Sequence, residues 1–241
     1  MNLLILDAGH SFNTKGKNNA KENFYEWQFN NDMQYKVKKR CEELGIKVFL
    51  TNPNPATVSD IPLTTRANLG NDYWLKNGKP KSIFISLHAN AFTSSSARGT
   101  ETYIAKNAST TSKNFAKVLN DNIVNVMKKL DTNAKDRGVK SENFTVIYKA
   151  SMPSVLVEYG FYSNLDDLKI LKNNKDELVE ATVKAICNYF DIEYKEKVNK
   201  VEFDGNLYAV CVGAYKDRNK ANSIVKELKE KGYTSTYLII R

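Results

Sequence analysis

The stretch Leu3-Leu-Ile-Leu-Asp-Ala-Gly-His10 begins apolar, turns polar and ends in a histidine. Two later stretches share this form, Ser82-Ile-Phe-Ile-Ser-Leu-His88 and Ser154-Val-Leu-Val-Glu158. Short continuous apolar runs are typical of strands buried on both faces of a parallel sheet. Ligands bind beyond the carboxyl ends of such strands. We therefore expect His10, His88 and Glu158 to meet at one edge of one sheet.

Helical patterns alternate with these strands. The spacing of apolar residues predicts helices over residues 26–44, 63–75, 115–130, 165–171 and 175–190. Further strands are expected at 46–50, 100–104 and 145–148, with a turn at 136–138. Strands that alternate with helices indicate a largely parallel sheet covered on both faces. The predicted fold class is α/β, a largely parallel sheet flanked by helices, followed by a small C-terminal βαβ unit.

The composition limits the classes of partner. The chain has 241 residues, 41% of them hydrophobic, which suits one full domain plus a small one. A net charge of +9 favours polyanions without distinguishing nucleic acid, anionic lipid and wall polymers. RNP-like motifs, zinc-finger spacings and dense Lys/Arg stretches are absent, so we expect no nucleic-acid partner. No stretch is long enough to predict a membrane span.

The cysteines and the first residues bear on the compartment. Cys41, Cys187 and Cys211 are odd in number, far apart and outside any C-x-x-C pair, so we predict buried, reduced thiols. The apolar start Met1–Leu6 is broken at once by Asp7, and it lacks the length and cleavage site of a signal peptide. We therefore expect synthesis in the cytoplasm without a Sec-type export signal.

The chain contains only two histidines, and both follow predicted strands. A catalytic zinc typically takes three nitrogen or oxygen ligands and leaves a fourth position for water. Two imidazoles and one carboxylate satisfy that requirement, and a second carboxylate can then act as the base. Chance placement of two ordinary histidines is the alternative. The matching positions of His10, His88 and Glu158 favour a metal site, which divalent ions other than zinc would also fit.

Four motifs around these positions resemble the signatures of zinc N-acetylmuramoyl-L-alanine amidases of the amidase-3 type. They are Asp7-Ala-Gly-His10, Glu26-Trp-Gln-Phe-Asn30, Ser86-Leu-His-Ala-Asn90 and Leu156-Val-Glu-Tyr-Gly-Phe161. The resemblance spans about residues 1–190 and is supported by Arg66-Ala-Asn68 and Gly99-Thr-Glu-Thr-Tyr103. It departs from the family at Ala8 and Ser11, where Pro and Gly are usual, and neither position supplies a ligand.

The resemblance assigns roles to residues of this chain. It implies that His10, Glu26 and His88 hold Zn²⁺ and that Glu158 is the catalytic base. It also implies the substrate, bacterial peptidoglycan, and the reaction, hydrolysis of the amide between N-acetylmuramic acid and L-alanine. Glu22, four residues before Glu26, competes for the ligand role on chemistry alone, and only Glu26 fits the family's position.

Among the other residues of the motifs, Asp7 and Asn90 have two interpretations each. Asp7 either orients a metal ligand or satisfies loop amides. Asn90 either binds substrate or shapes the loop after His88. Arg66 is interpreted as structural, because most charged residues of helices have no part in a site.

The predicted domains are a catalytic domain at 1–191, a linker at 192–205 and a C-terminal unit at 206–241. The last of these resembles half of a SPOR-type peptidoglycan-binding repeat, with strands at 207–214 and 234–240 around a helix at 220–231. Two strands and one helix bury little surface, so we expect two chains to pair their tails in a homodimer. Folding back onto the catalytic domain is the alternative. Wall binding, dimerisation or both remain open.

Three functional readings follow. The first is the amidase, acting on the cell wall after release through a holin pore or by lysis. The second is another zinc amidohydrolase or carboxypeptidase acting on wall peptides. The third is a non-catalytic wall-binding protein, which the complete set His10, Glu26, His88 and Glu158 disfavours.

Overall fold

The computed structural model describes residues 1–196 and 215–232, and the chain divides into two units, Met1–Glu196 and Lys197–Arg241. In the second unit, helix α7 (Arg218–Glu230) begins after Asp217, whose carboxylate accepts hydrogen bonds from the N–H groups of Asn219 and Lys220. The strands predicted at 207–214 and 234–240 lie outside the described residues, as does Cys211.

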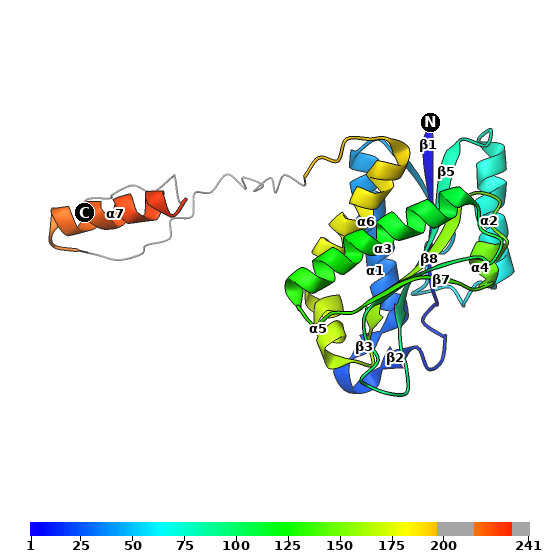
Figure 1. Cartoon of the computed structure of the whole chain (residues 1–241), viewed down its shortest axis with the longest axis horizontal. Helices are drawn as coiled ribbons and strands as arrows, with labels where there is room; N and C mark the ends of the chain where they lie inside the picture. Colours follow the sequence, from blue (N-terminus) through cyan, green and yellow to red (C-terminus); the bar gives the residue numbers. More distant parts are fainter. Residues whose placement is uncertain (197–214, 233–241) are drawn as a thin grey trace. The chain divides into compact units, whose positions relative to one another are not determined.

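A six-stranded sheet with helices on either side of it forms the centre of the first unit (Figure 1). Its strand order is β4-β1-β5-β8-β6-β7. Its strands are β1 (Asn2–Ala8), β4 (Lys47–Leu50), β5 (Lys81–Asn90), β6 (Thr100–Ile104), β7 (Asp136–Ser141) and β8 (Ser154–Phe161). All neighbouring strands are parallel except β6 and β8, which are antiparallel. A short antiparallel pair, β2 (Asn18–Asn19) and β3 (Phe24–Tyr25), precedes the first long helix.

Helices cover both faces of this sheet. They are α1 (Glu26–Glu43), α2 (Leu63–Lys76), α3 (Thr110–Leu130), α4 (Thr145–Tyr148), α5 (Leu165–Asn173) and α6 (Lys175–Phe190), with a 3₁₀ turn at Ala20–Glu22. The expected α/β class and largely parallel sheet are confirmed.

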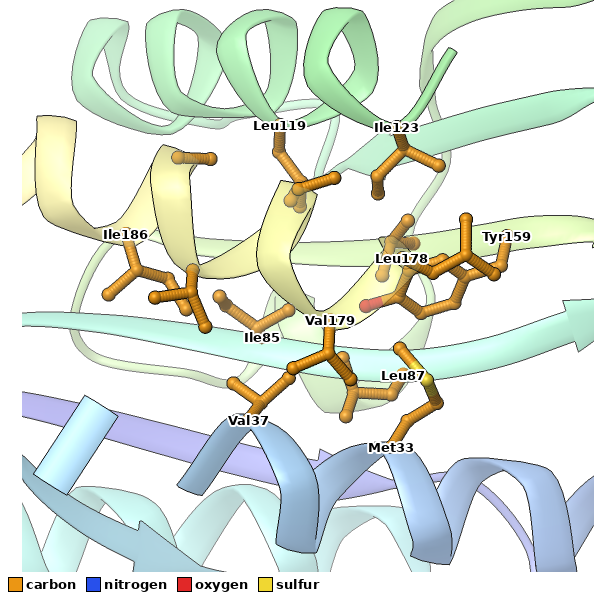
Figure 2. Close-up of a cluster of buried hydrophobic side chains, with 14 of the residues drawn as sticks. Met33, Val37, Ile85, Leu87, Leu119, Ile123, Tyr159, Leu178, Val179 and Ile186 are labelled. Atoms are coloured by element: carbon orange, nitrogen blue, oxygen red, sulfur yellow. The ribbon is translucent and has the colours of Figure 1, made fainter. Parts of the chain in front are cut away.

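Alternate side chains of β1 enter two different cores, as the two-residue period of a strand requires. Leu4 and Leu6 belong to the larger core, which α1, α3 and α6 cover. Figure 2 shows this core, where side chains of these three helices meet those of β5 and β8. Leu3 and Ile5 belong to the smaller core beneath α2 and α4. Every residue of β1 from 3 to 8 is buried, and this part of the strand is apolar except at Asp7.

Two short predictions are wrong. The run Thr145–Tyr148, predicted as a strand, is helix α4, because a helical turn places Val146 and Ile147 together in the smaller core. The predicted turn at Asp136–Gly138 is instead the first half of β7. Gly138 adopts a φ of 72° there, and the register with β6 is irregular at this point, so turn-like residues build an irregular strand.

The two described cysteines are buried free thiols, as expected. Burial raises the pKa of both thiols, Cys41 and Cys187. Within residues 1–196 and 215–232, no helix combines the length and the apolarity needed to cross a membrane.

Candidate functional site

His10 lies just beyond the carboxyl end of β1, where the backbone makes a sharp turn. Its φ of 67° is in the left-handed region, which is uncommon for a residue with a side chain. Three hydrogen bonds from two side-chain amides hold this turn: Asn30 donates to the carbonyl of Gly9, and Asn52 donates to the carbonyls of Ala8 and His10. The turn is therefore fixed by buried hydrogen bonds.

His88 occupies the corresponding position near the carboxyl end of β5, the neighbour of β1. The two imidazole rings lie edge to face, with centroids 5.1 Å apart and an angle of 89° between their planes. Gly9 lies against the His88 ring, and a Cβ atom built on it would be 2.1 Å from Cε1. The glycine therefore leaves the space that the second imidazole occupies.

Glu26 brings a carboxylate to these rings from the first residue of α1, and only 2% of its side chain is exposed. Its Oε1 lies 3.3 Å from Nε2 of His10 and 3.0 Å from Nδ1 of His88, and it also accepts from the N–H of Ala89. Burial raises the pKa of Glu26, but its contacts with both histidines outweigh this and lower it to about 2. The carboxylate is therefore ionised. Glu22 is not part of the cluster.

The donor atoms of His10, Glu26 and His88 all lie within 4.8 Å of one another. Zinc bonds to nitrogen and oxygen are about 2.0–2.2 Å long, so tetrahedral ligand atoms lie roughly 3.4 Å apart. The separations of 3.0 and 3.3 Å between Glu26 and the two rings are close to this value. The donor set and its spacing therefore fit a small divalent cation of the zinc type.

Glu158 is the register partner of His88 on the adjacent strand β8, and it lies outside the three-residue donor cluster. Its Oε2 is buried and makes no hydrogen bond within the described residues. Burial raises the pKa of Glu158 well above its usual value, the charges of Glu26 and Glu101 add to this, and Lys17 opposes it. Glu158 is thus a half-buried carboxylate beside a metal-type cluster, with one buried oxygen that has no partner among the described residues, and it is available to exchange protons.

Glu101 continues the same row, because it is the register partner of Glu158 across the antiparallel pair β6 and β8. His88, Glu158 and Glu101 therefore stand side by side on three neighbouring strands. No role was expected for Glu101, although it lies within Gly99-Thr-Glu-Thr-Tyr103, which supports the family resemblance. A charged residue within a strand pattern was the available signal.

Asp7 contacts neither histidine, and its partners lie in the loop after β4, on β5 and on α2. Its carboxylate accepts hydrogen bonds from Thr51 at 2.6 Å and Ser86 at 2.7 Å, and it lies 3.3 Å from Arg66. Arg66 is fully buried and also donates to the carbonyls of Ala8 and Ile61. This network holds the end of β1 and ties it to Ser86 on β5, the strand that carries His88.

Asn90 donates to Glu101 at 2.7 Å, and its carbonyl accepts from the N–H of Tyr162. Its side-chain oxygen accepts from the N–H of Ala91. These contacts favour the interpretation that Asn90 shapes the loop after β5. Asn30 and Asn52, which hold the His10 turn, had no assigned role, since an amide in a helix or turn carries no distinct sequence signal.

Comparison with known proteins identifies the same family that the sequence motifs resemble. Residues 4–188 match the family model for N-acetylmuramoyl-L-alanine amidase, Amidase_3. The sporulation-specific N-acetylmuramoyl-L-alanine amidase of Bacillus subtilis is 25% identical over 195 residues, which cover 81% of this chain and 68% of the relative. The endolysin of Bacillus phage SPP1 is 27% identical over 202 residues, covering 80% and 68%.

Solved structures agree. The catalytic domain of CwlV, an N-acetylmuramoyl-L-alanine amidase from Bacillus (Paenibacillus) polymyxa, superposes with a TM-score of 0.68 at 29% identity. The match covers 80% of this chain and all of that domain. Both the sequence and the arrangement of its first unit therefore place this chain in the Amidase_3 family of N-acetylmuramoyl-L-alanine amidases, enzymes of the bacterial cell wall.

Proposed function

We propose that the chain is a zinc-dependent amidase that hydrolyses the bond between N-acetylmuramic acid and L-alanine in peptidoglycan. His10, Glu26 and His88 hold the zinc, and Glu158 is the general base. The observation that carries this proposal is a two-imidazole, one-carboxylate cluster next to a carboxylate on the adjacent strand whose buried oxygen has no hydrogen-bond partner among the described residues.

The chain's own residues supply positioning and proton transfer. When bound, zinc supplies Lewis acidity, which favours deprotonation of water and polarises an amide carbonyl. Glu158 takes a proton from the water that attacks the lactyl carbonyl carbon. As the new C–O bond forms and the C–N bond breaks, the same carboxyl delivers that proton to the alanine nitrogen. The products are a lactyl carboxylic acid and a free amine.

The first experiment measures turbidity loss of purified Gram-positive cell walls and the metal content per chain. Wild-type protein should lyse the walls and retain about one zinc. Glu158→Gln should retain the zinc and lose nearly all lysis, because it removes the base and keeps the ligands. Equal lysis by Glu158→Gln and wild type would exclude Glu158 as the base.

A matched pair of acidic residues tests the ligand assignment. Glu26→Gln should lose both zinc and activity, since it removes a ligand charge from the cluster. Glu22→Gln should lose neither, since this nearby acid lies outside the cluster. Retention of zinc by Glu26→Gln would contradict the assignment.

The products separate the amidase from other hydrolases. New amino groups on L-alanine identify cleavage at the lactyl amide, whereas a carboxypeptidase releases a terminal amino acid of the stem. A non-catalytic wall-binding protein would sediment with the walls and release neither product.

We also propose that the enzyme reaches the wall after release from the cytoplasm, as an endolysin or lysin does. Similarity to the endolysin of phage SPP1 supports this setting. Fractionation of producing cells before and after lysis tests it: the protein should stay with the cytoplasmic fraction until the cells lyse.

A further inference from the structure

Next to the proposed base lies a charged cluster that the amide-hydrolysis mechanism does not use. Glu101 is 2% exposed, yet its carboxylate has four side-chain partners. Oε1 accepts from Asn90 at 2.7 Å and Tyr103 at 2.8 Å, while Oε2 accepts from Arg137 at 2.5 Å and from Lys140. One buried carboxylate therefore holds two cations of β7.

Arg137 is held in a fixed orientation. Its Nε is bonded to Glu101, and its guanidinium carbon lies 4.9 Å from the centre of the Phe161 ring. Its two terminal nitrogens make no hydrogen bond within the described residues, and 35% of the side chain is exposed. A planar guanidinium with its outer edge open is suited to bidentate binding of a carboxylate.

Lys140 adds a second charge at the same place. Its ammonium group contacts Glu101 and lies 5.8 Å from the centre of the Tyr103 ring, and 37% of the side chain is exposed. Two cations around one carboxylate leave a surplus of one positive charge. Each cation is about one-third exposed, so an anion from solvent can reach both.

We infer that Arg137 and Lys140 bind a free carboxylate of the stem peptide, on the second residue after the scissile amide, and thereby select acidic over amidated stems. The inference rests on the proposed function, because it takes Glu158 as the point of hydrolysis.

The distance from Glu158 to Arg137 fits a carboxylate on the second residue of the stem peptide. Glu158, Glu101 and the β7 segment that carries Arg137 lie on three neighbouring strands. Two strand spacings are about 10 Å. A second peptide residue extends about 7 Å from the scissile nitrogen. The arginine side chain is long enough to span the distance that remains between the peptide carboxylate and β7.

The test uses two substrates that differ only in this group: N-acetylmuramoyl-L-alanyl-γ-D-glutamyl-L-lysine and its D-isoglutaminyl counterpart, in which a carboxamide replaces the α-carboxylate of the second residue. In both, the γ-carboxyl of that residue is bonded to lysine, so only the first substrate has a free carboxylate there. Wild-type protein should cleave the acidic substrate with about tenfold higher kcat/KM, mainly through a lower KM. In Arg137→Gln this preference should fall to near one, through loss on the acidic substrate alone. Arg137→Lys should retain part of it.

The preference is a ratio measured on one protein sample, so a fraction of misfolded variant cancels. Lys106→Gln is the matched control, because it removes one positive charge from an exposed ion pair with Glu142, beyond the other end of β6. It should keep the wild-type preference. Equal cleavage of both substrates by wild type overturns this inference and leaves the amidase intact. Cleavage of neither, together with inactivity on walls, overturns both.

Discussion

Gly9, directly after β1, lies against the imidazole ring of His88 on the neighbouring strand β5. The ring occupies the space that a side chain at position 9 would need. A Cβ atom at Gly9 would lie 2.1 to 2.5 Å from three atoms of that ring, far inside contact distance. The partner is a ring held between β1 and Glu26, so it cannot move aside without leaving the donor cluster.

Gly9→Ala should therefore lower metal affinity without unfolding the chain. Displacing a residue that orients a ligand typically costs 10- to 100-fold in affinity, and we expect a loss of about that size. Zinc titration against a competing chelator measures it. Gly16→Ala is the control: it strains a φ of 74° but places Cβ within 4 Å of nothing, so it should leave zinc affinity unchanged. Equal affinity of Gly9→Ala and wild type would contradict the steric argument.

Some residues of this site can be predicted from sequence patterns and others cannot. His10, His88 and Glu158 end continuous apolar runs, and parallel strands bring such ends together, so their meeting is predictable from the sequence. Glu26 opens a helix instead, and only the family resemblance singled it out. Its place beside the rings depends on how α1 packs on the sheet.

The burial and the partners of residues that make long-range contacts could not be predicted. Arg66 reads as a surface charge of a helix, yet it is fully buried against the loop after β1. Glu101 reads as a polar position in a strand, yet it anchors two cations. The β-branched run Thr145–Tyr148 favours a strand locally, and packing in the smaller core makes it helical.

Pairing of two C-terminal units stays a prediction, and helix α7 offers a way to test it. Ile224 and Leu228 are half-buried, whereas Lys226 is exposed. If two chains pair through this unit, light scattering should give the mass of a dimer, and Leu228→Asp should give a monomer. Lys226→Asp should remain dimeric. A wild-type chain that stays monomeric up to high micromolar concentration would rule the pairing out.

Glu158 should destabilise the metal-free protein at neutral pH. Burial, with the neighbouring charges of Glu26 and Glu101, raises the pKa of its carboxyl in the folded state. A group whose pKa is raised in the folded state contributes stability below its unfolded pKa. That contribution is lost as the pH rises through the pKa of the folded state.

Glu158→Gln should therefore raise the melting temperature of chelator-treated protein at pH 7, by roughly 2–4 °C. At pH 4 the difference should vanish. A lower melting temperature for the variant at pH 7 would contradict this assignment of charge.

Arg66 and Asp7 form a buried ion pair whose loss should strongly destabilise the fold. Both side chains are 1% exposed, and the Arg66 guanidinium donates to Asp7, to Asp60 and to two backbone carbonyls. Arg66→Met removes these donors and leaves the Asp7 carboxylate buried without a cation. Breaking a buried pair in this way costs about 3–5 kcal/mol, and urea unfolding followed by tryptophan fluorescence should show a loss of that size. The exposed pair Lys38 and Glu42 gives the comparison, since Lys38→Gln should change stability by less than about 0.5 kcal/mol.

Adding Asp7→Asn to Arg66→Met should recover part of the stability that Arg66→Met loses. The reason is that the unpaired Asp7 charge, and not the missing contact, carries most of the penalty. A double variant no more stable than Arg66→Met would mean that the bonds of Arg66 to the backbone carbonyls, rather than its charge, hold the end of β1.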